Sequence, residues 1–127
     1  MEMKIELIPI PVTDVDRAIE FYKKVGFILD HDHVVHENLR FVQLTPPGSA
    51  CSIVIGKGIS PMKPGSIDAY QVVIKNAKDA REQLLHNGIE VSEVDVQPWG
   101  NFVYFHDPDG NKWSLQEIPQ KNSSSIR

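Results

Sequence analysis

The feature that most constrains this chain is an internal repeat with a period of 62 residues. Helix caps, helix stops and turn residues match at this interval without a gap. The matching pairs are Asp14 and Asn76, Ala18 and Ala80, Gly26 and Gly88, Pro46 and Pro108, Gly48 and Gly110, and Ser52 and Ser114. A repeat of this kind indicates one supersecondary unit that is present twice and buries its apolar faces against its own copy.

Each copy contains the same order of elements. An apolar strand within residues 3–12 precedes a helix from Asp14 to Gly26, and extended segments follow at 27–36, 39–44 and 51–55. In the second copy a strand at 67–75 precedes a helix between Asn76 and Gly88, followed by extended segments at 89–96, 102–105 and 112–118. The order in both halves is therefore β-α-β-β-β.

These patterns predict an α+β fold of two βαβββ modules. The modules span about residues 3–56 and 67–118, and a linker at 57–66 rich in proline and glycine joins them. We expect a single domain over residues 1–119, with the polar, serine-rich residues 120–127 as a flexible tail.

The last turn and strand show how one sheet face could carry function. Pro108 and Gly110 favour a tight turn, and the strand that follows alternates between apolar and polar residues. Trp113 and Leu115 share the packed face, while Ser114 and Gln116 share the opposite, polar face.

Charge and composition exclude several classes of protein. The net charge of −4 argues against nucleic-acid binding, which needs a basic surface. No apolar run is long enough to span a bilayer, and the acidic, proline-containing start of the chain is not that of a signal peptide. A single cysteine, Cys51, cannot form an internal disulfide, so we expect a cytoplasmic protein.

Two motifs resemble the vicinal-oxygen-chelate superfamily, which includes glyoxalase I, extradiol dioxygenases and bleomycin-resistance proteins. They are the segment from Pro11 to Ala18 followed by Phe21-Tyr22 and Gly26-Phe27, and the segment from Phe105 to Asn111. The resemblance implies curved mixed sheets that form a cup, helices on the outer face, and a homodimer. In the enzymes of this family the cup holds a divalent metal with ligands from the first and fourth strands of both modules.

Carried onto this chain, the implied ligand positions are Leu7, Ser52, Ala69 and Ser114. Leucine and alanine have no donor atom and a neutral serine hydroxyl is a poor ligand, so we predict that the metal site is lost and no cofactor is bound. A slip of one residue would instead select Glu6, Cys51, Asp68 and Trp113, which keeps two carboxylates and a thiol but loses the paired pattern.

The histidines offer other candidates. His31 and His33 share a face of one strand and could hold a metal with a third ligand, but the spacing indicates none, and a solvated strand is favoured. His106 stands at the entrance of the last turn, where it could act as an acid or base or simply bond with the neighbouring Asp107.

The polar face of the cup is the predicted ligand site. Neutral and amide side chains beside apolar walls suit a small molecule, with aromatic residues on the rim. The predicted ligand-binding residues are Ser52, Gln71, Trp99, Phe102, Ser114 and Gln116. We therefore expect a metal-free, bleomycin-resistance-like protein that binds a small, partly aromatic molecule.

Three alternatives remain open at this point. The chain could be a lyase or dioxygenase-type enzyme that uses a relocated divalent metal or metal-free acid/base groups such as Glu6, Asp68 or His106. It could be an accessory domain that acts on a partner protein. The cup could also be filled by its own side chains and serve only as a core.

Overall fold

The computed structural model describes residues 1–119, so the tail predicted at 120–127 lies outside the described residues. The chain divides into two compact units. The first contains residues 1–67 together with 107–111, and the second contains 68–106 together with the described residues from Lys112 onward. Neither helix within this part of the chain is long and apolar enough to cross a membrane.

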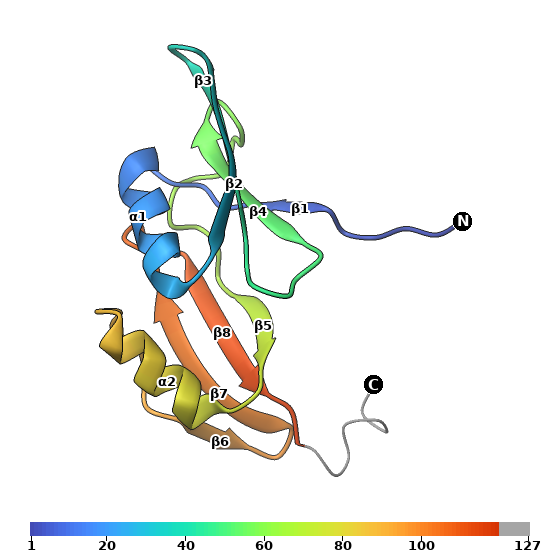
Figure 1. Ribbon diagram of the computed structural model, residues 1–127, viewed down its shortest axis with the longest axis vertical. Helices are drawn as coiled ribbons and strands as arrows, with labels where there is room; N and C mark the ends of the chain where they lie inside the picture. The colour runs from blue at the N-terminus through green and yellow to red at the C-terminus, as the bar shows by residue number, and fades with distance from the viewer. Residues whose placement is uncertain (120–127) are drawn as a thin grey trace. The chain divides into compact units, whose positions relative to one another are not determined.

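The first unit is a four-stranded mixed sheet with one helix (Figure 1). Its elements are β1 (Leu7–Pro9), α1 (Val15–Val25), β2 (Ile28–His36), β3 (Leu39–Thr45) and β4 (Ser52–Lys57). The strand order is β1-β4-β3-β2, with β1 parallel to β4 and the other pairs antiparallel. The hairpin of β2 and β3 extends from the sheet (Figure 1). Every residue of β2 is exposed.

Helix α1 begins and ends where the sequence predicts. The Asp14 carboxylate accepts a 3.0 Å hydrogen bond from the Arg17 backbone N–H, and Gly26 closes the helix with a φ of 119°. Three residues of the helix, at helical spacing, are buried: Ala18, Ile19 and Tyr22. This apolar stripe holds the helix against the sheet.

The turn at residues 107–111 belongs to the first unit and is fixed there by buried polar contacts. Asp107 accepts hydrogen bonds from the Tyr22 hydroxyl at 2.8 Å and from the Asn111 amide at 2.9 Å. The same Asn111 amide donates to the Pro11 carbonyl at 2.8 Å. Because these groups are buried and partnered, the motif from Phe105 to Asn111 has a structural role.

The second unit repeats the same order of elements. It contains β5 (Tyr70–Ile74), α2 (Ala77–His86), β6 (Asp95–Gln97), β7 (Gly100–His106) and β8 (Lys112–Glu117). The strand order β5-β8-β7-β6 matches that of the first unit, with β5 parallel to β8. The α+β fold with two βαβββ modules is thus confirmed.

One face of the second sheet forms the core of its unit. Trp113 is 2% exposed, stacks on Phe105 at 6.2 Å between ring centroids, and meets Tyr70 edge-on at 5.7 Å. Helix α2 packs on β7 and β8 and buries Ala77 and Leu84. Side chains alternate along a strand, so Ser114 and Gln116 lie on the opposite face.

The strands predicted at 3–12, 67–75 and 89–96 are all clearly shorter than expected, and of residues 67–75 only Tyr70–Ile74 form a strand. Only Leu7–Pro9 of residues 3–12 pairs as a strand, because Pro9 and Pro11 have no N–H to donate to a ladder. Of residues 89–96, only Asp95 and Val96 are in a strand. Further upstream, Ser92 bonds to the backbone of Tyr104 through its own N–H and its hydroxyl instead of a regular ladder.

The strand registers also depart from the uniform repeat. Leu7 lies opposite Ser52, but Ser114 lies opposite Gln71 and not Ala69, a shift of two residues. An even shift keeps the same face of the strand, so Gln71 takes the place predicted for Ala69. The repeat therefore holds for caps and turns but not for the pairing of the first strands.

Candidate functional site

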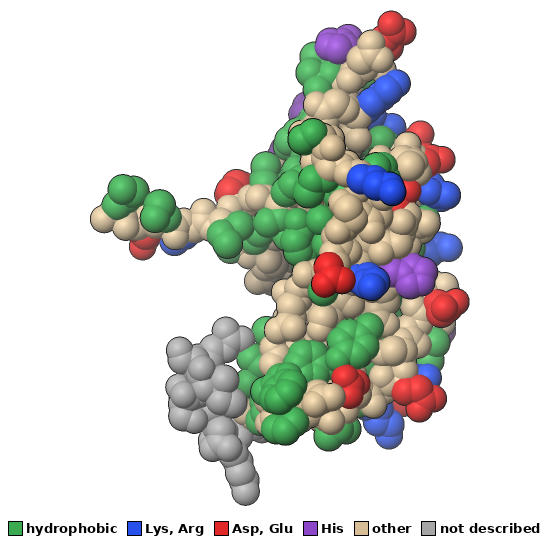
Figure 2. Space-filling view, turned by 180° about the vertical axis from the view of Figure 1, so that it is seen from behind, with side chains coloured by type: hydrophobic (Ala, Val, Ile, Leu, Met, Phe, Trp, Pro, Cys, Tyr) green, Lys and Arg blue, Asp and Glu red, His purple; other side chains and the backbone are tan. Residues whose placement is uncertain are grey.

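The polar face of the second sheet holds a pocket of about 690 Å³, within the size range of small-molecule sites. Every residue that lines it belongs to the second unit. Hydrophobic side chains gather over this unit in Figure 2, with acidic side chains beside them. The sheet orders the lining: β5 carries Gln71, β8 carries Ser114 and Gln116, and β7 carries Phe102 and Tyr104.

Aromatic rings make up the apolar part of the pocket. Phe102 and Tyr104 are two positions apart on β7, and their rings stack at 6.1 Å with an angle of 13° between planes. Phe102 is only 5% exposed, whereas Trp99, in the turn between β6 and β7, is 57% exposed. Phe102 is therefore a floor residue, and Trp99 lies at the rim.

A chain of hydrogen bonds orders the amides along the pocket. The Ser114 hydroxyl donates to the Gln71 side-chain oxygen at 3.4 Å, and the Gln71 nitrogen donates to the Gln116 oxygen at 2.9 Å. The Gln116 nitrogen then donates to the Trp99 carbonyl at 3.0 Å. Each amide nitrogen has two N–H groups, so both glutamines keep one donor for a ligand.

Gly100 makes the last of these contacts sterically possible. It has a φ of 148°, and a Cβ added there would lie 2.6 Å from the Glu117 carbonyl oxygen and 3.2 Å from the Gln116 amide nitrogen. Any side chain would collide with the backbone of β8, so glycine is required for the Trp99 turn to approach Gln116.

On the other side of the pocket, Asp95 on β6 organises two polar side chains. The Tyr104 hydroxyl donates to Asp95 at 2.6 Å, and the Gln97 amide nitrogen donates to the second Asp95 oxygen at 2.9 Å. The bond to Asp95 raises the pKa of Tyr104 to about 12, and the same bond, with that from Gln97, lowers the pKa of Asp95.

Five of the six predicted ligand-binding residues line this single pocket: Gln71, Trp99, Phe102, Ser114 and Gln116. Ser52 does not. It lies in the first unit, where its hydroxyl is 2.6 Å from the Thr45 hydroxyl and accepts a 3.3 Å bond from the Gln43 amide.

Sequence reasoning missed Tyr104, Gln97 and their carboxylate partner Asp95. The alternation of Phe102, Tyr104 and His106 along one strand was the available signal for Tyr104. Residues 89–96 were predicted to be extended, but only Asp95–Gln97 forms a strand, so the prediction did not place Asp95 or Gln97 on the pocket face.

The implied metal positions do not provide a ligand set. Leu7 lacks a donor atom, and the hydroxyls of Ser52 and Ser114 are engaged with neighbouring neutral side chains. Gln71, which occupies the position expected for Ala69, offers only one neutral amide, and that amide is already bonded to Gln116. No cluster of three or more histidine, cysteine, aspartate or glutamate residues within residues 1–119 could hold a metal.

The alternative set displaced by one residue is equally unsuited to a metal. Trp113 is buried in the core of the second unit, and Asp68 is exposed and pairs with Lys112 at 3.8 Å. Cys51 is half-buried, and its desolvation, followed by the nearby negative charge of Glu6, raises the pKa of its thiol. A raised pKa disfavours the thiolate that binds metals.

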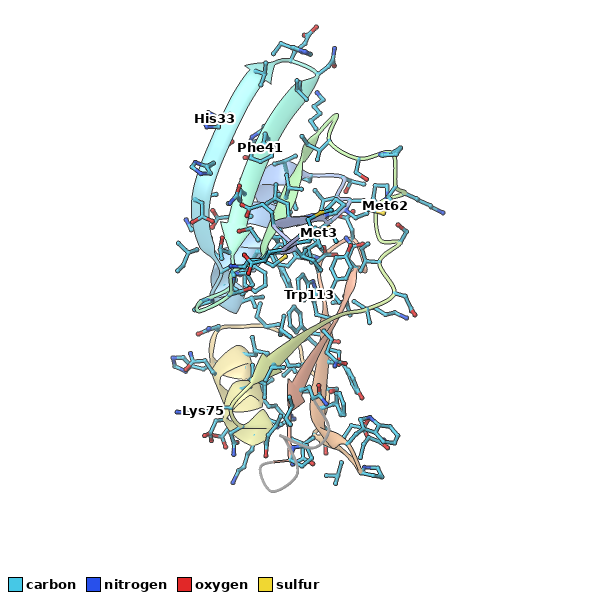
Figure 3. All side chains as sticks on the ribbon, turned by 90° about the vertical axis from the view of Figure 1, so that its right-hand side faces the viewer. Met3, His33, Phe41, Met62, Lys75 and Trp113 are labelled. Carbon is cyan, nitrogen blue, oxygen red and sulfur yellow. The ribbon has the colours of Figure 1, made fainter. Side chains whose placement is uncertain are left out.

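The histidines are separated between the two units. His31 and His33 stack at 6.0 Å on exposed β2, and His33 lies beside Phe41 of β3 (Figure 3). Between them, Asp32 accepts two bonds from the Arg40 guanidinium, which lowers the pKa of that carboxyl. His106 instead lines the pocket of the second unit, near the end where Lys112 and Asp68 lie.

Comparison with known proteins matches most of the chain to one family. Residues 4–115 match the Glyoxalase/Bleomycin resistance protein/Dioxygenase superfamily. The chain is 30% identical over 122 residues to a Bacillus subtilis (strain 168) protein named Uncharacterized protein YetH, covering 92% of this chain and all of that protein.

Solved structures show the same relationship. TnmS3, described as an antibiotic binding protein from Streptomyces sp. CB03234, is 29% identical with a TM-score of 0.82, covering 93% of this chain and 98% of TnmS3. A glyoxalase/bleomycin resistance protein from the same organism is 30% identical with a TM-score of 0.76, covering 89% and 99% of the two chains.

Proposed function

The chain belongs to the glyoxalase/bleomycin resistance protein/dioxygenase superfamily, and from its pocket we propose that it binds a small aromatic molecule without a metal ion. The observation that carries the proposal is the composition of the pocket. Stacked Phe102 and Tyr104 lie beside two glutamines that each keep an unused N–H donor, and residues 1–119 contain no cluster of metal ligands beside them. Apolar walls with a few oriented polar groups are typical of ligand sites.

The similarity to TnmS3 supports the same proposal, because that protein is described as one that binds an antibiotic. Aromatic side chains stack on planar ligands and bury large areas with little loss of side-chain freedom. A planar aromatic compound is therefore the class of ligand that this pocket suits best. We further propose that the protein is cytoplasmic and forms a homodimer. Light scattering after gel filtration would test the dimer.

Equilibrium dialysis against 2-naphthol tests the binding proposal. Trp99→Ala should weaken binding by about tenfold, which corresponds to the loss of one aromatic contact in a small-ligand site. Val96→Ala is the matched control, since Val96 is exposed on the neighbouring strand and does not line the pocket. Equal binding by the wild type and Trp99→Ala, or no binding by the wild type at millimolar probe, would contradict the proposal.

Metal-free catalysis is the second candidate, and the position of His106 favours it. His106 lines the same pocket as Tyr104, so an imidazole could exchange a proton with a bound molecule. Mass spectrometry of each bound compound after prolonged incubation separates binding from conversion. Recovery of unchanged compound supports the binding role, and a product that His106→Ala no longer forms supports the enzyme.

A further inference from the structure

The hydrogen bonds of the second unit leave donors on one side of the pocket and acceptors on the other. On the β5 and β8 side, the oxygens of Gln71 and Gln116 each already accept one hydrogen bond, while each amide nitrogen keeps one N–H that is not used by a neighbour. On the β7 and β6 side, the Tyr104 hydroxyl hydrogen is donated to Asp95, so only lone pairs of that oxygen remain. The pocket thus has a donor side and an acceptor side.

Gln97 reinforces the acceptor side. One of its amide N–H groups points to Asp95 at 2.9 Å, which turns its side-chain oxygen away from the carboxylate. Gln97 and Tyr104 both line the pocket, whereas Asp95 is bonded to both of them and does not line it. A phenol oxygen whose hydrogen is held by a carboxylate becomes a stronger acceptor, because hydrogen bonds in a chain polarise one another.

The charges around the pocket favour a positive ligand group at this side. Asp95 is the carboxylate bonded to Tyr104. Lys112, which also lines the pocket, lies at the far end of β8 and pairs with Asp68. The faces of Trp99, Phe102 and Tyr104 are also electronegative, and such faces attract ammonium groups.

From this arrangement we propose that the ligand is an aromatic amine bound as its ammonium cation, with Asp95 as the positioning residue that selects the charge. The ammonium N–H groups donate to the Tyr104 oxygen and the Gln97 side-chain oxygen, and the ring lies against Phe102. The opposite edge of the ligand accepts from Gln71 or Gln116. This assignment rests on the proposed small-molecule function and specifies the class of compound.

Three naphthalene probes of nearly equal shape test the assignment: 2-naphthylmethylammonium, the neutral 2-ethylnaphthalene and the anionic 2-naphthoate. Equilibrium dialysis at neutral pH should show the cation binding at least about tenfold more tightly than its neutral isostere, since one charge-assisted hydrogen bond is sufficient for that ratio. The anion should bind most weakly.

Two variants separate selectivity from folding. Asp95→Asn should reduce the ratio of cation affinity to 2-ethylnaphthalene affinity to within about threefold. A folding defect would instead weaken all three probes alike and leave this ratio unchanged. Asp95→Glu should restore part of the preference. Glu82→Gln, which removes one charge from the exposed surface of α2, is the control and should keep the full ratio.

The outcomes distinguish the two proposals. A wild-type protein that binds 2-ethylnaphthalene as tightly as the cation overturns the charge assignment and leaves small-molecule binding intact. Retention of the preference in Asp95→Asn overturns the role of Asp95. Failure of all three probes, together with failure of 2-naphthol, overturns the binding function itself.

Discussion

The Tyr104 hydroxyl donates a 2.6 Å hydrogen bond to Asp95, and Thr45 makes the equivalent contact with Asp30 in the first unit. Thr45 and Tyr104 are both on the third strand of their modules, and Asp30 and Asp95 are both on the second. Each unit therefore links these strands by a hydroxyl and a carboxylate. Only in the second unit does the hydroxyl come from a ring that lines the pocket of the proposed ligand.

The Tyr104–Asp95 bond should be visible in the ionisation of the phenol. Asp95→Asn should lower the pKa of Tyr104 from about 12 towards its ordinary value of 10. An ultraviolet titration of phenolate absorbance measures this change, and Tyr104→Phe identifies which of the three tyrosines produces the step. An unchanged titration curve in Asp95→Asn would show that the carboxylate does not hold the hydroxyl.

The same pair contributes to stability only within a defined pH range. The pKa of Tyr104 is raised on folding, and a neutral phenol is the form that donates, so the contribution is lost as the pH rises above about 10. The pKa of Asp95 is lowered, so the contribution is also lost as the pH falls below about 4. The difference in unfolding midpoint between wild type and Tyr104→Phe should therefore be largest between these limits.

The buried hydroxyl of Tyr22 should matter more for stability. Tyr22 is fully buried and donates to Asp107 in the first unit, so Tyr22→Phe leaves a buried carboxylate oxygen without this donor. We expect a loss of about 1–3 kcal/mol in the free energy of unfolding, measured with urea. Tyr104→Phe is the matched control, and because its hydroxyl is at the surface its loss should be smaller. Equal effects from both substitutions would contradict the structural role assigned to the turn.

The repeat explains why the fold could be predicted more completely than the site. Caps and turns need particular residue types, so Asp14, Gly26 and Gly110 indicated the βαβββ order from the sequence alone. The register between strands requires no particular residue types, so it could not be predicted from the sequence in the same way. Thr45 and Tyr104 are 59 residues apart, not 62, because the connection between β7 and β8 is longer: Leu44 pairs with Ile53 nine residues later, whereas Val103 pairs with Leu115 twelve residues later.

This difference hid the equivalence of the two hydroxyl–carboxylate pairs. Alternation along β8 was enough to place Ser114 and Gln116 on the pocket face, and alternation along β5 placed Gln71 beside them. Asp95 and Gln97 lie on a three-residue strand, which is too short to show a period. Their contribution to the pocket depends on side-chain hydrogen bonds that only the structure reveals.

Gly100→Ala should damage both stability and binding. The new Cβ would lie 2.6 Å from the Glu117 carbonyl oxygen, so β7 and β8 must move apart where Gln116 reaches the Trp99 carbonyl. We expect a loss of about 2–4 kcal/mol in a urea titration, together with weaker binding of 2-naphthol. Gly48→Ala is the control, since its positive φ is also strained but open space surrounds it, and it should cost about 1 kcal/mol. Similar losses in both variants would show that the close approach to β8 is unimportant.

The last prediction concerns the metal that enzymes of this family hold. Protein purified without chelators should contain less than about 0.1 equivalent of iron, manganese, nickel or zinc, since Leu7 has no donor and Ser52, Gln71 and Ser114 offer only neutral groups already bonded to one another or to neighbours. Elemental analysis measures this directly, and added metal should leave the thermal midpoint unchanged.

A double variant, Gln71→Glu with Ser114→His, places two good ligands on paired positions of β5 and β8 and serves as the positive control. Zinc should raise the thermal midpoint of that variant, because binding to the folded state alone is stabilising. Stoichiometric metal in the wild-type protein would overturn the metal-free proposal and favour the enzymatic alternative.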